Sequence, residues 1–416
     1  MTKMEMKDVL KHFPVLLGLV LLVLSGCEQK DSSVGSSLAP GLMDEYPQEV
    51  ILDPVASAFY QAQATTGASP YLYAGLMNDH RADFLVKFEP YYYLPDSFAV
   101  DSLLVKLFLD SVLVADSDPL NIDVLFVNKS QVWAEIGITW DNLDSLELGD
   151  PITSIEVPSS AAMGDSVSFS FPAPDSLLRA WASAGSGEKT LHYNNGLYFK
   201  ADPPSDQMVR FSSSEYGTIS VLPRLEMYLT VIDTTDTTGV VEIDTLINAY
   251  PISDAFIAND VTGIQDSTYL YLGNAVACRS ILMYDLDGLF QSYGVGIHSA
   301  EVILHADTTS EYNIDVINGA FTLGMVDTTW KQDPANAPIG FGVSVVLGYY
   351  DREEATLTLN LNDMVYDWIR NPGTNQGFMI KSFDEYLNIS RTVFYGINAP
   401  DSLRPRLRII YVENDS

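Results

Sequence analysis

Aromatic side chains are the residues whose type and placement first suggest binding chemistry. Three of them are consecutive: Tyr91, Tyr92 and Tyr93. Because side chains alternate between the two faces of a strand, these three rings cannot all point inward. At least one must face solvent or a neighbouring domain. We therefore expect here either a contact with a sugar, whose C–H face matches an aromatic ring, or an interdomain contact. Further candidates for ligand contact are Trp133, Tyr349 and Tyr350.

No pattern in the chain indicates catalysis. None of the five histidines has a partner at a zinc-ligand spacing, and no serine lies in a G-x-S-x-G context. The sequence also has no Gly-rich phosphate loop. We therefore expect a protein without enzymatic activity or cofactor. A polysaccharide hydrolase is the least favoured alternative, because it would need two carboxylates that converge in a cleft, one of them in an apolar setting.

Asp-rich turns are the places where a metal could bind. The segments DSDPLNID (Asp116 to Asp123) and DLDG (Asp285 to Gly288) carry several carboxylates each, and calcium prefers oxygen ligands. Neither segment has the ligand spacing of an EF-hand loop. A structural calcium ion in such a turn and a turn that is only hydrated therefore stay as two alternatives, with no ligand residues assigned.

The N-terminal segment predicts export and a lipid anchor. Three lysines precede PVLLGLVLLVL (residues 14–24), an apolar stretch too short to span a bilayer. It leads into LSGC, which resembles the lipobox of bacterial lipoproteins. Residues 1–26 are therefore interpreted as a signal peptide and Cys27 as the lipidated first residue. Glu28 in the next position favours, by the same resemblance, the outer membrane. The expected location is the cell envelope, either periplasmic or surface-exposed.

The charge of the chain limits its partners. It has 55 acidic and 22 basic residues, which gives a net charge of −33. Nucleic-acid binding depends on Lys and Arg residues that neutralise phosphates, so this class of partner is excluded. The negative electrostatic potential of such a chain also disfavours polyanionic ligands, unless basic residues cluster locally. With Cys27 acylated, only Cys278 is left, so no intramolecular disulfide is expected and Cys278 is predicted to be a buried thiol.

Short runs of alternating apolar and polar residues make up the body of the chain. Examples are DSLLVKLFLD, NIDVLFV and SVSFSF, separated by Asp, Ser, Pro and Gly. This pattern predicts β-strands rather than long helices. One buried face per strand predicts two packed antiparallel sheets. Residues 27–48 are small and polar, and we expect them to form a flexible tether.

The strands occur in two tandem copies. PRLEMYLTV (Pro223 to Val231) recurs as RPRLRIIYV (Arg404 to Val412), YLYAG recurs as YLYLG, and NIDV occurs twice, all in the same order. Each copy has about 165 to 185 residues, which is too long for a solenoid repeat. We therefore predict an all-β fold of two tandem, jelly-roll-like antiparallel β-sandwiches, each with one short helix. The predicted boundaries are 49–232 for the first sandwich, 233–246 for an acidic Thr-rich linker, and 247–416 for the second sandwich.

Several residues occupy equivalent places in the two copies. Tryptophans present in both copies are expected to belong to the cores. Arginines present in both are expected to pair with carboxylates at a sheet end rather than with a ligand. Trp133 has no counterpart in the second copy, which is why it counts as a ligand candidate. The equivalent pairs are Arg81 and Arg279, Trp140 and Trp330, Trp181 and Trp368, and Arg224 and Arg406.

The repeated unit resembles the DNRLRE domain family, which is also classed among carbohydrate-binding modules. The resemblance rests on SAEVIL (Ser299 to Leu304), WAEIGITW (Trp133 to Trp140) and RPRLRIIYV, and it covers both copies. The second copy departs from the pattern in GMVDTTW, which lacks the upstream Trp and Glu, and Leu222 stands where the family has an arginine. The resemblance implies a jelly-roll β-sandwich with a non-catalytic, glycan-binding or surface role.

These observations lead to one expected function and two alternatives. The first is a cell-envelope lipoprotein whose tandem sandwiches bind extracellular or cell-surface carbohydrate. The second is a structural or adhesive surface protein that binds a protein partner, and a polysaccharide hydrolase ranks third. The expected partners are the membrane, reached through the lipid anchor, and a polysaccharide or a surface protein.

Overall fold

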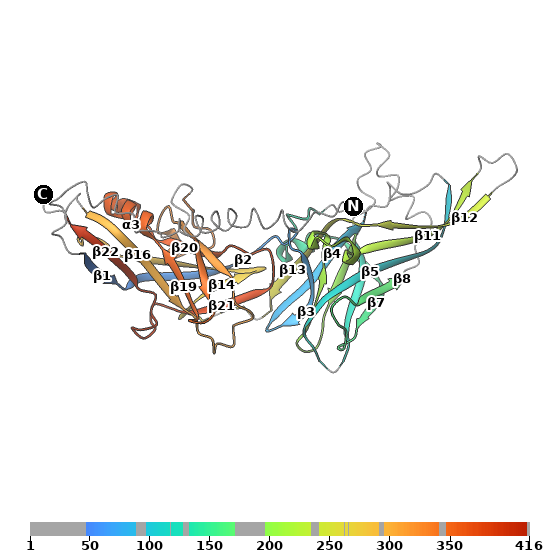
Figure 1. The fold of residues 1–416 in the computed structure, drawn as a ribbon, viewed down its shortest axis with the longest axis horizontal. Helices are drawn as coiled ribbons and strands as arrows, with labels where there is room; N and C mark the ends of the chain where they lie inside the picture. The colour runs from blue at the N-terminus through green and yellow to red at the C-terminus, as the bar shows by residue number, and fades with distance from the viewer. Residues whose placement is uncertain are drawn as a thin grey trace, which may run out of the picture.

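The computed structural model confirms an all-β chain, built as two antiparallel sandwiches that lie end to end along the long axis of the molecule (Figure 1). Strand pairs throughout the described residues are antiparallel. No helix within this part of the chain is both long and apolar enough to cross a membrane. The structure describes residues 47–413 except 89–96, 117, 128–132, 171–195, 234–240, 262, 265, 291–294 and 341–346.

The first sandwich is a curled sheet in which eleven strands are described. Strand β5 belongs to both layers, because its first half pairs with β11 and β8 whereas its second half pairs with β10 after changes in register. The rings of Phe84 and Phe199 stack in its core with centroids 4.3 Å apart. The strands are β3 (Tyr71–Met77), β4 (His80–Phe88), β5 (Phe98–Val114), β6 (Leu120–Val127), β7 (Leu148–Val157), β8 (Ser166–Ser170), β9 (Leu197–Ala201), β10 (Gln207–Ser212), β11 (Arg224–Asp233), β12 (Val241–Ala249) and β13 (Pro251–Asp260).

The second sandwich combines a sheet of nine described strands with the separate pair β14–β21. A short helix was predicted in each copy. Helix α3 (Asn362–Arg370) is that of the second copy and buries Met364, Val365 and Trp368 on one face. The segment around Trp181, predicted as the helix of the first copy, lies outside the described residues. The strands are β1 (Gln48–Leu52), β2 (Pro54–Gln63), β14 (Tyr269–Asn274), β15 (Val276–Tyr284), β16 (Val295–His305), β17 (Gly319–Gly324), β18 (Leu347–Asp351), β19 (Thr356–Asn360), β20 (Phe378–Ser382), β21 (Ser390–Tyr395) and β22 (Leu407–Glu413).

Short 3-10 turns connect several strands of both sandwiches. The turn η3 contributes to a cluster of acidic residues described below, and η5 contains the buried Trp330. The turns are η2 (Trp140–Ser145), η3 (Ser214–Tyr216), η4 (Ile219–Val221), η5 (Thr329–Lys331) and η6 (Pro372–Thr374).

The first strand pairs of the two copies have changed places. Strand β1 pairs with β22, and β2 pairs with β15, so residues 48–63 complete the second sandwich. The equivalent strands of the second copy, β12 and β13, pair instead with β11 and β4 of the first sandwich. The two Pro-Arg-Leu motifs lead into β11 and β22, so the exchange uses matching edges. The predicted boundaries therefore follow the sequence repeats but not the sandwiches, and residues 241–246 of the predicted linker lie in β12.

The tryptophans predicted to be core residues are buried to different degrees. Trp330 is fully buried, and its indole Nε1 donates to the carbonyl oxygen of Gln376 at 2.8 Å. Trp368 is buried on α3, whereas Trp140 is half-buried. Cys278 is fully buried, as expected, and burial raises the pKa of its thiol to about 12.

Candidate binding cleft

A cleft with a volume of about 500 Å³ opens between the two sandwiches. One wall is the outer face of the sheet formed by β15, β20 and β17, and the other wall includes residues 63–68, which connect β2 to β3. Ile136 of the first sandwich, 76% exposed, also lines the cleft. This volume lies within the range of about 300 to 1,000 Å³ that is typical of small-molecule sites.

Four side chains form a row across this sheet, and three of them, Arg279, Lys381 and Phe321, line the cleft. Tyr60 on β2 lies opposite Arg279 on β15, and Lys381 on β20 lies opposite Phe321 on β17. The adjacent pairs of facing residues join β15 to β20. The register of these strands therefore places all four side chains on one face of the sheet. The Arg279 guanidinium is 5.8 Å from the centre of the Tyr60 ring, and Lys381 Nζ is 5.1 Å from that of Phe321. The two cations therefore lie side by side in the middle of the row, and an aromatic ring stands at each end.

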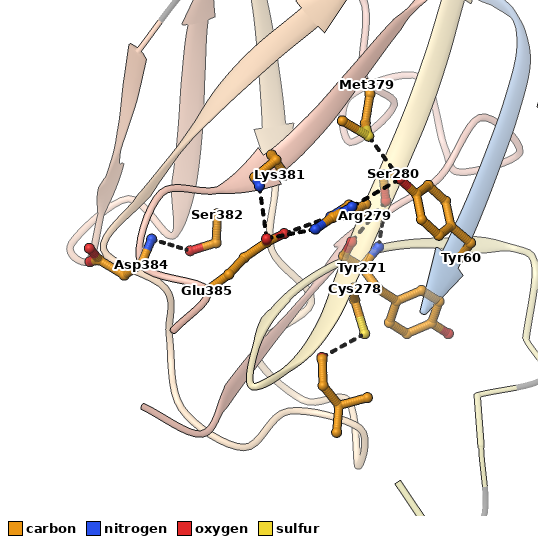
Figure 2. A network of polar contacts seen from close by, with 11 residues as sticks. Tyr60, Tyr271, Cys278, Arg279, Ser280, Met379, Lys381, Ser382, Asp384 and Glu385 are labelled. Carbon is orange, nitrogen blue, oxygen red and sulfur yellow. Dashed lines mark hydrogen bonds and ion pairs between the residues drawn. The ribbon is translucent and has the colours of Figure 1, made fainter. Parts of the chain in front are cut away.

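Glu385 forms ion pairs with both cations of the row (Figure 2). Arg279 donates from Nε to Oε1 and from Nη2 to Oε2, both at 2.9 Å, and Lys381 Nζ lies 2.9 Å from Oε2. Burial alone would lower the pKa of Arg279, but the hydrogen bonds with Glu385 outweigh it and raise that pKa. Two cations against one carboxylate leave a net positive charge here, in a chain whose total is −33.

An aromatic group extends the cleft beyond Phe321. Phe383 lines the cleft, and its ring lies over Gly319, where a Cβ atom would collide with Cε1 of that ring. Tyr349 is 71% exposed and meets Phe383 edge-on, with ring centroids 5.9 Å apart. Tyr386, also exposed, lines the same cleft. The cleft thus offers exposed ring surface next to the Arg279–Lys381 cations.

The opposite wall is closely packed against the first sandwich. Gly67 backs onto Glu135, so that a Cβ atom at Gly67 would collide with Cγ of Glu135. Ser69 Oγ donates to the carbonyl oxygen of Leu387 at 2.8 Å, and the amide of Ala64 donates to the carbonyl oxygen of Ala275 at 3.0 Å. These contacts hold residues 63–69 between the sandwiches and shape the cleft.

The structure places the predicted aromatic ligand residues in different surroundings. Tyr91, Tyr92 and Tyr93 lie outside the described residues. Trp133 is only 6% exposed and packs with Leu85, Leu125, Ala255 and Ile257, so its ring is not available to stack on a sugar and the ligand prediction gives way to a core role. Tyr349 and Tyr350 alternate on β18: Tyr349 points toward the cleft group, whereas Tyr350 packs edge-on against the core residue Phe394.

The arginines present in both copies contact carboxylates, as their equivalence predicted. Arg279 differs from the others because it also lines the cleft, so the expectation of a purely structural role is too narrow for it. Arg81 additionally lies 5.5 Å from the Trp140 ring. The carboxylate partners and distances are Asp202 at 3.0 Å for Arg81, Glu385 at 2.9 Å for Arg279, Glu226 at 3.0 Å for Arg224, and Asp53 at 2.7 Å for Arg406.

Comparisons with known proteins add little to this description. No protein-family model and no curated protein matches the chain. The C-terminal domain of the Streptococcus pyogenes antigen I/II-family protein AspA is 9% identical, with 89% of this chain and 92% of that chain covered and a TM-score of 0.14. A structure named BspA_C_mut is 8% identical, with 89% and 90% covered and a TM-score of 0.12. Such low scores carry no information about the function of this chain.

Proposed function

We propose that the protein is a non-catalytic lipoprotein of the cell envelope whose cleft between the sandwiches binds extracellular or cell-surface carbohydrate. The observation that carries this proposal is the group of Arg279, Lys381 and Phe321 that lines the cleft, extended by Phe383 and the exposed ring of Tyr349. Aromatic rings offer faces for the C–H side of a sugar, and the cations offer hydrogen-bond donors for its oxygens.

The charge of the cleft favours a sugar that carries a carboxylate. An acidic chain repels polyanions in general, but a local group of basic residues can reverse the sign of the field. Lys381 has three donors, of which Glu385 accepts one, so hydrogen-bonding capacity is left for a ligand. We therefore expect uronic-acid residues of a polysaccharide to bind better than neutral sugars.

The carboxylates of the cleft support binding rather than hydrolysis. Glycosidases generally use a pair of carboxylic groups on either side of the scissile bond. Among the described residues that line the cleft, Glu385 is the carboxylate, and it is engaged by both Arg279 and Lys381. Glu385 therefore has no second carboxylate among the described lining residues that could share the acid and base roles of hydrolysis with it.

The membrane anchor belongs to the same proposal and rests on the N-terminal sequence. Lipidation of Cys27 would tether the sandwiches to the envelope, with the outer membrane favoured by Glu28. Incorporation of labelled palmitate into the full chain, and its loss in Cys27→Ser, would test this part separately from the binding cleft.

A glycan array with both neutral and acidic polysaccharides tests the binding function. The soluble chain from residue 28 should bind acidic glycans, and Lys381→Ala and Tyr349→Ala should each weaken binding at least tenfold. Lys331→Ala and Tyr366→Ala are matched controls, since both side chains are exposed away from the cleft and should leave binding unchanged. If the wild-type chain binds no glycan, or if the cleft variants bind as well as the controls, the proposal fails.

A second candidate function is attachment to a protein partner. The hairpin of β11 and β12 projects from the end of the first sandwich (Figure 1). It exposes Tyr228 (38%) next to its cross-strand partner Leu246 (50%). Exposed apolar pairs of this kind occur at protein interfaces. Loss of cell adhesion in Leu246→Ser, with glycan binding intact, would favour this function over the first.

A further inference from the structure

Three carboxylates converge in the first sandwich, and one of them, Glu135, packs behind the cleft wall at Gly67. Glu135, Glu215 and Asp254 each place an oxygen within 4.8 Å of the others. They come from three separate parts of the chain: the segment that follows Trp133, the turn η3 and the strand β13. Neither Asp-rich turn of the sequence contributes to this cluster.

Asp254 is the buried member of the cluster, and one of its oxygens has no partner. The residue is 1% exposed. Its Oδ2 accepts a hydrogen bond from the backbone amide of Ser214 at 2.8 Å, whereas Oδ1 is buried without any hydrogen bond. Burial, and next the charge of Glu215, raise the pKa of Asp254 well above its usual range. A buried carboxylate oxygen without a partner is costly, so something else is expected to satisfy it.

Within the described residues, no basic side chain pairs with any of the three carboxylates. None of the ion pairs in the described part of the chain includes Glu135, Glu215 or Asp254. The hydrogen bonds that they accept come from neutral groups: Glu135 from the amide of Asp254 at 3.0 Å, and Glu215 from the hydroxyls of Ser213 and Ser214. Like charges this close favour the binding of a cation or of a proton.

The second sandwich provides an internal comparison. The alignment of the two copies on Pro54 and Pro251 sets Asp254 against Ser57. Alignment on Trp140 and Trp330 sets Glu135 against Met325, and alignment on Phe211 and Phe394 sets Glu215 against Asn398. Met325 packs in an apolar cluster with Ile281, Trp330 and Met379. The three carboxylates therefore occur together in one copy and are all replaced in the other.

We propose that Glu135, Glu215 and Asp254 bind a calcium ion. Calcium is bound by oxygen ligands at about 2.3 to 2.6 Å, so two ligands of one ion lie at most about 5 Å apart, which agrees with the spacing of these oxygens. Its flexible coordination of six to eight oxygens suits three protein carboxylates completed by water, whereas magnesium demands stricter octahedral geometry. Because Asp254 lies on β13, the ion joins the exchanged strand to two other parts of the first sandwich.

Calorimetric titration and thermal melting of the chelator-treated chain test this site. Calcium should bind with one ion per chain and at least ten times more tightly than magnesium, and it should raise Tm by about 5 °C at saturating concentrations. Asp254→Asn should abolish both the calcium heat and the shift in Tm. Glu156→Gln, which neutralises an exposed carboxylate on β7 of the same sandwich, should retain them.

The melting temperature of the metal-free variant keeps the test decisive. In the chelated protein the Asp254 carboxylate lies beside two like charges and one of its oxygens has no partner, so metal-free Asp254→Asn should melt at or above the metal-free wild type. A wild-type chain without calcium heat would overturn the proposal. A wild-type chain stabilised by acidification alone, with no response to calcium, would assign a shared proton to the cluster instead.

Discussion

Arg391 and Asp260 form a buried ion pair that joins the two sandwiches. Nη1 of Arg391, on β21 of the second sandwich, lies 2.7 Å from Oδ2 of Asp260, at the end of β13 in the first, and both side chains are 3% exposed. Gln61 Nε2 donates to the same oxygen at 2.9 Å, and Arg391 Nε donates to the carbonyl oxygen of Tyr312 at 2.6 Å. The pair therefore connects β2, β13 and β21 at one point.

Removal of the cation of this pair should destabilise the protein strongly. Arg391→Met leaves the Asp260 carboxylate buried without its cation, and we expect a loss of about 3 to 5 kcal/mol in the free energy of unfolding, measured with urea. Arg408→Met is the matched control, because Arg408 and its partner Glu49 are both about half exposed and the loss should be about 0 to 1 kcal/mol. Equal losses in the two variants would contradict this account.

His80 should make the stability fall in mildly acidic solution. It is fully buried beside this pair, and burial, followed by the charge of Arg391, lowers its pKa to about 4. Between pH 6.5 and about 4 the unfolded chain binds a proton at His80 that the folded chain does not. The free energy of unfolding should therefore decrease as the pH falls through this range, by up to about 3 kcal/mol, and this contribution is fully present above pH 6.5.

Urea titrations of the wild type and of His80→Gln from pH 4 to 7 measure this effect. The difference between their free energies of unfolding at each pH isolates the contribution of His80. Asp83, whose pKa burial raises to about 6, titrates in the same range with the opposite sign, because its folded form binds a proton more readily. This contribution is common to both chains and cancels in the difference. Identical pH profiles for the two chains would refute the assignment to His80.

Neutralisation of Glu385 should strengthen the binding of acidic glycans in the proposed cleft. Glu385→Gln releases Arg279 and Lys381 from their shared carboxylate, so affinity should rise and should depend more steeply on NaCl concentration. The loss of hydrogen bonds to a charged partner should cost about 2 kcal/mol of stability. Glu354→Gln, an exposed residue outside the cleft, is the control. Weaker binding by Glu385→Gln would argue against a carboxylated ligand.

The strand exchange predicts complementation in trans. A chain that starts at residue 64 lacks β1 and β2, so the edges of β22 and β15 are left open and the second sandwich should lose its cooperative unfolding. A peptide of residues 47–63 should restore it, as monitored by the fluorescence of the buried Trp330, which packs close to β2. The same peptide with Phe59→Asp, which removes the ring packed on Tyr271, should not.

The fold class could be predicted from the sequence, but the neighbour with which each strand pairs could not. Alternation identifies which face of a strand is buried and not which edge it joins. Both first strand pairs share a Pro-x-x-x-Ala-Phe pattern, at Pro54 to Phe59 and at Pro251 to Phe256, and both closing strands share Pro-Arg-Leu. Local pattern therefore fits exchanged and direct pairing equally well, and only the three-dimensional arrangement distinguishes them.

The site residues were predictable to a smaller extent. The repeat matches Arg279 with Arg81 and Lys381 with Lys200, but the strand register that brings Lys381 and Phe321 beside Arg279 is not visible in the sequence. The ligand prediction for Trp133 is wrong for a related reason. Its lack of a counterpart suggests a ligand, whereas the structure buries it among residues of the first copy, such as Leu85 and Leu125, together with Ala255 and Ile257 of the exchanged strand β13.

The exchange also sets the order in which the molecule can fold. Tyr411 donates to Oε1 of Gln48 across 363 residues of chain, a separation that makes this contact slow to form. During synthesis, the strands of the first sandwich are complete once residue 260 has emerged, whereas β1 and β2 must wait for β22. Open strand edges are prone to pair with other chains. The leading strand pair therefore stays without its partner strands for most of synthesis, and its edges are open to other chains during that time.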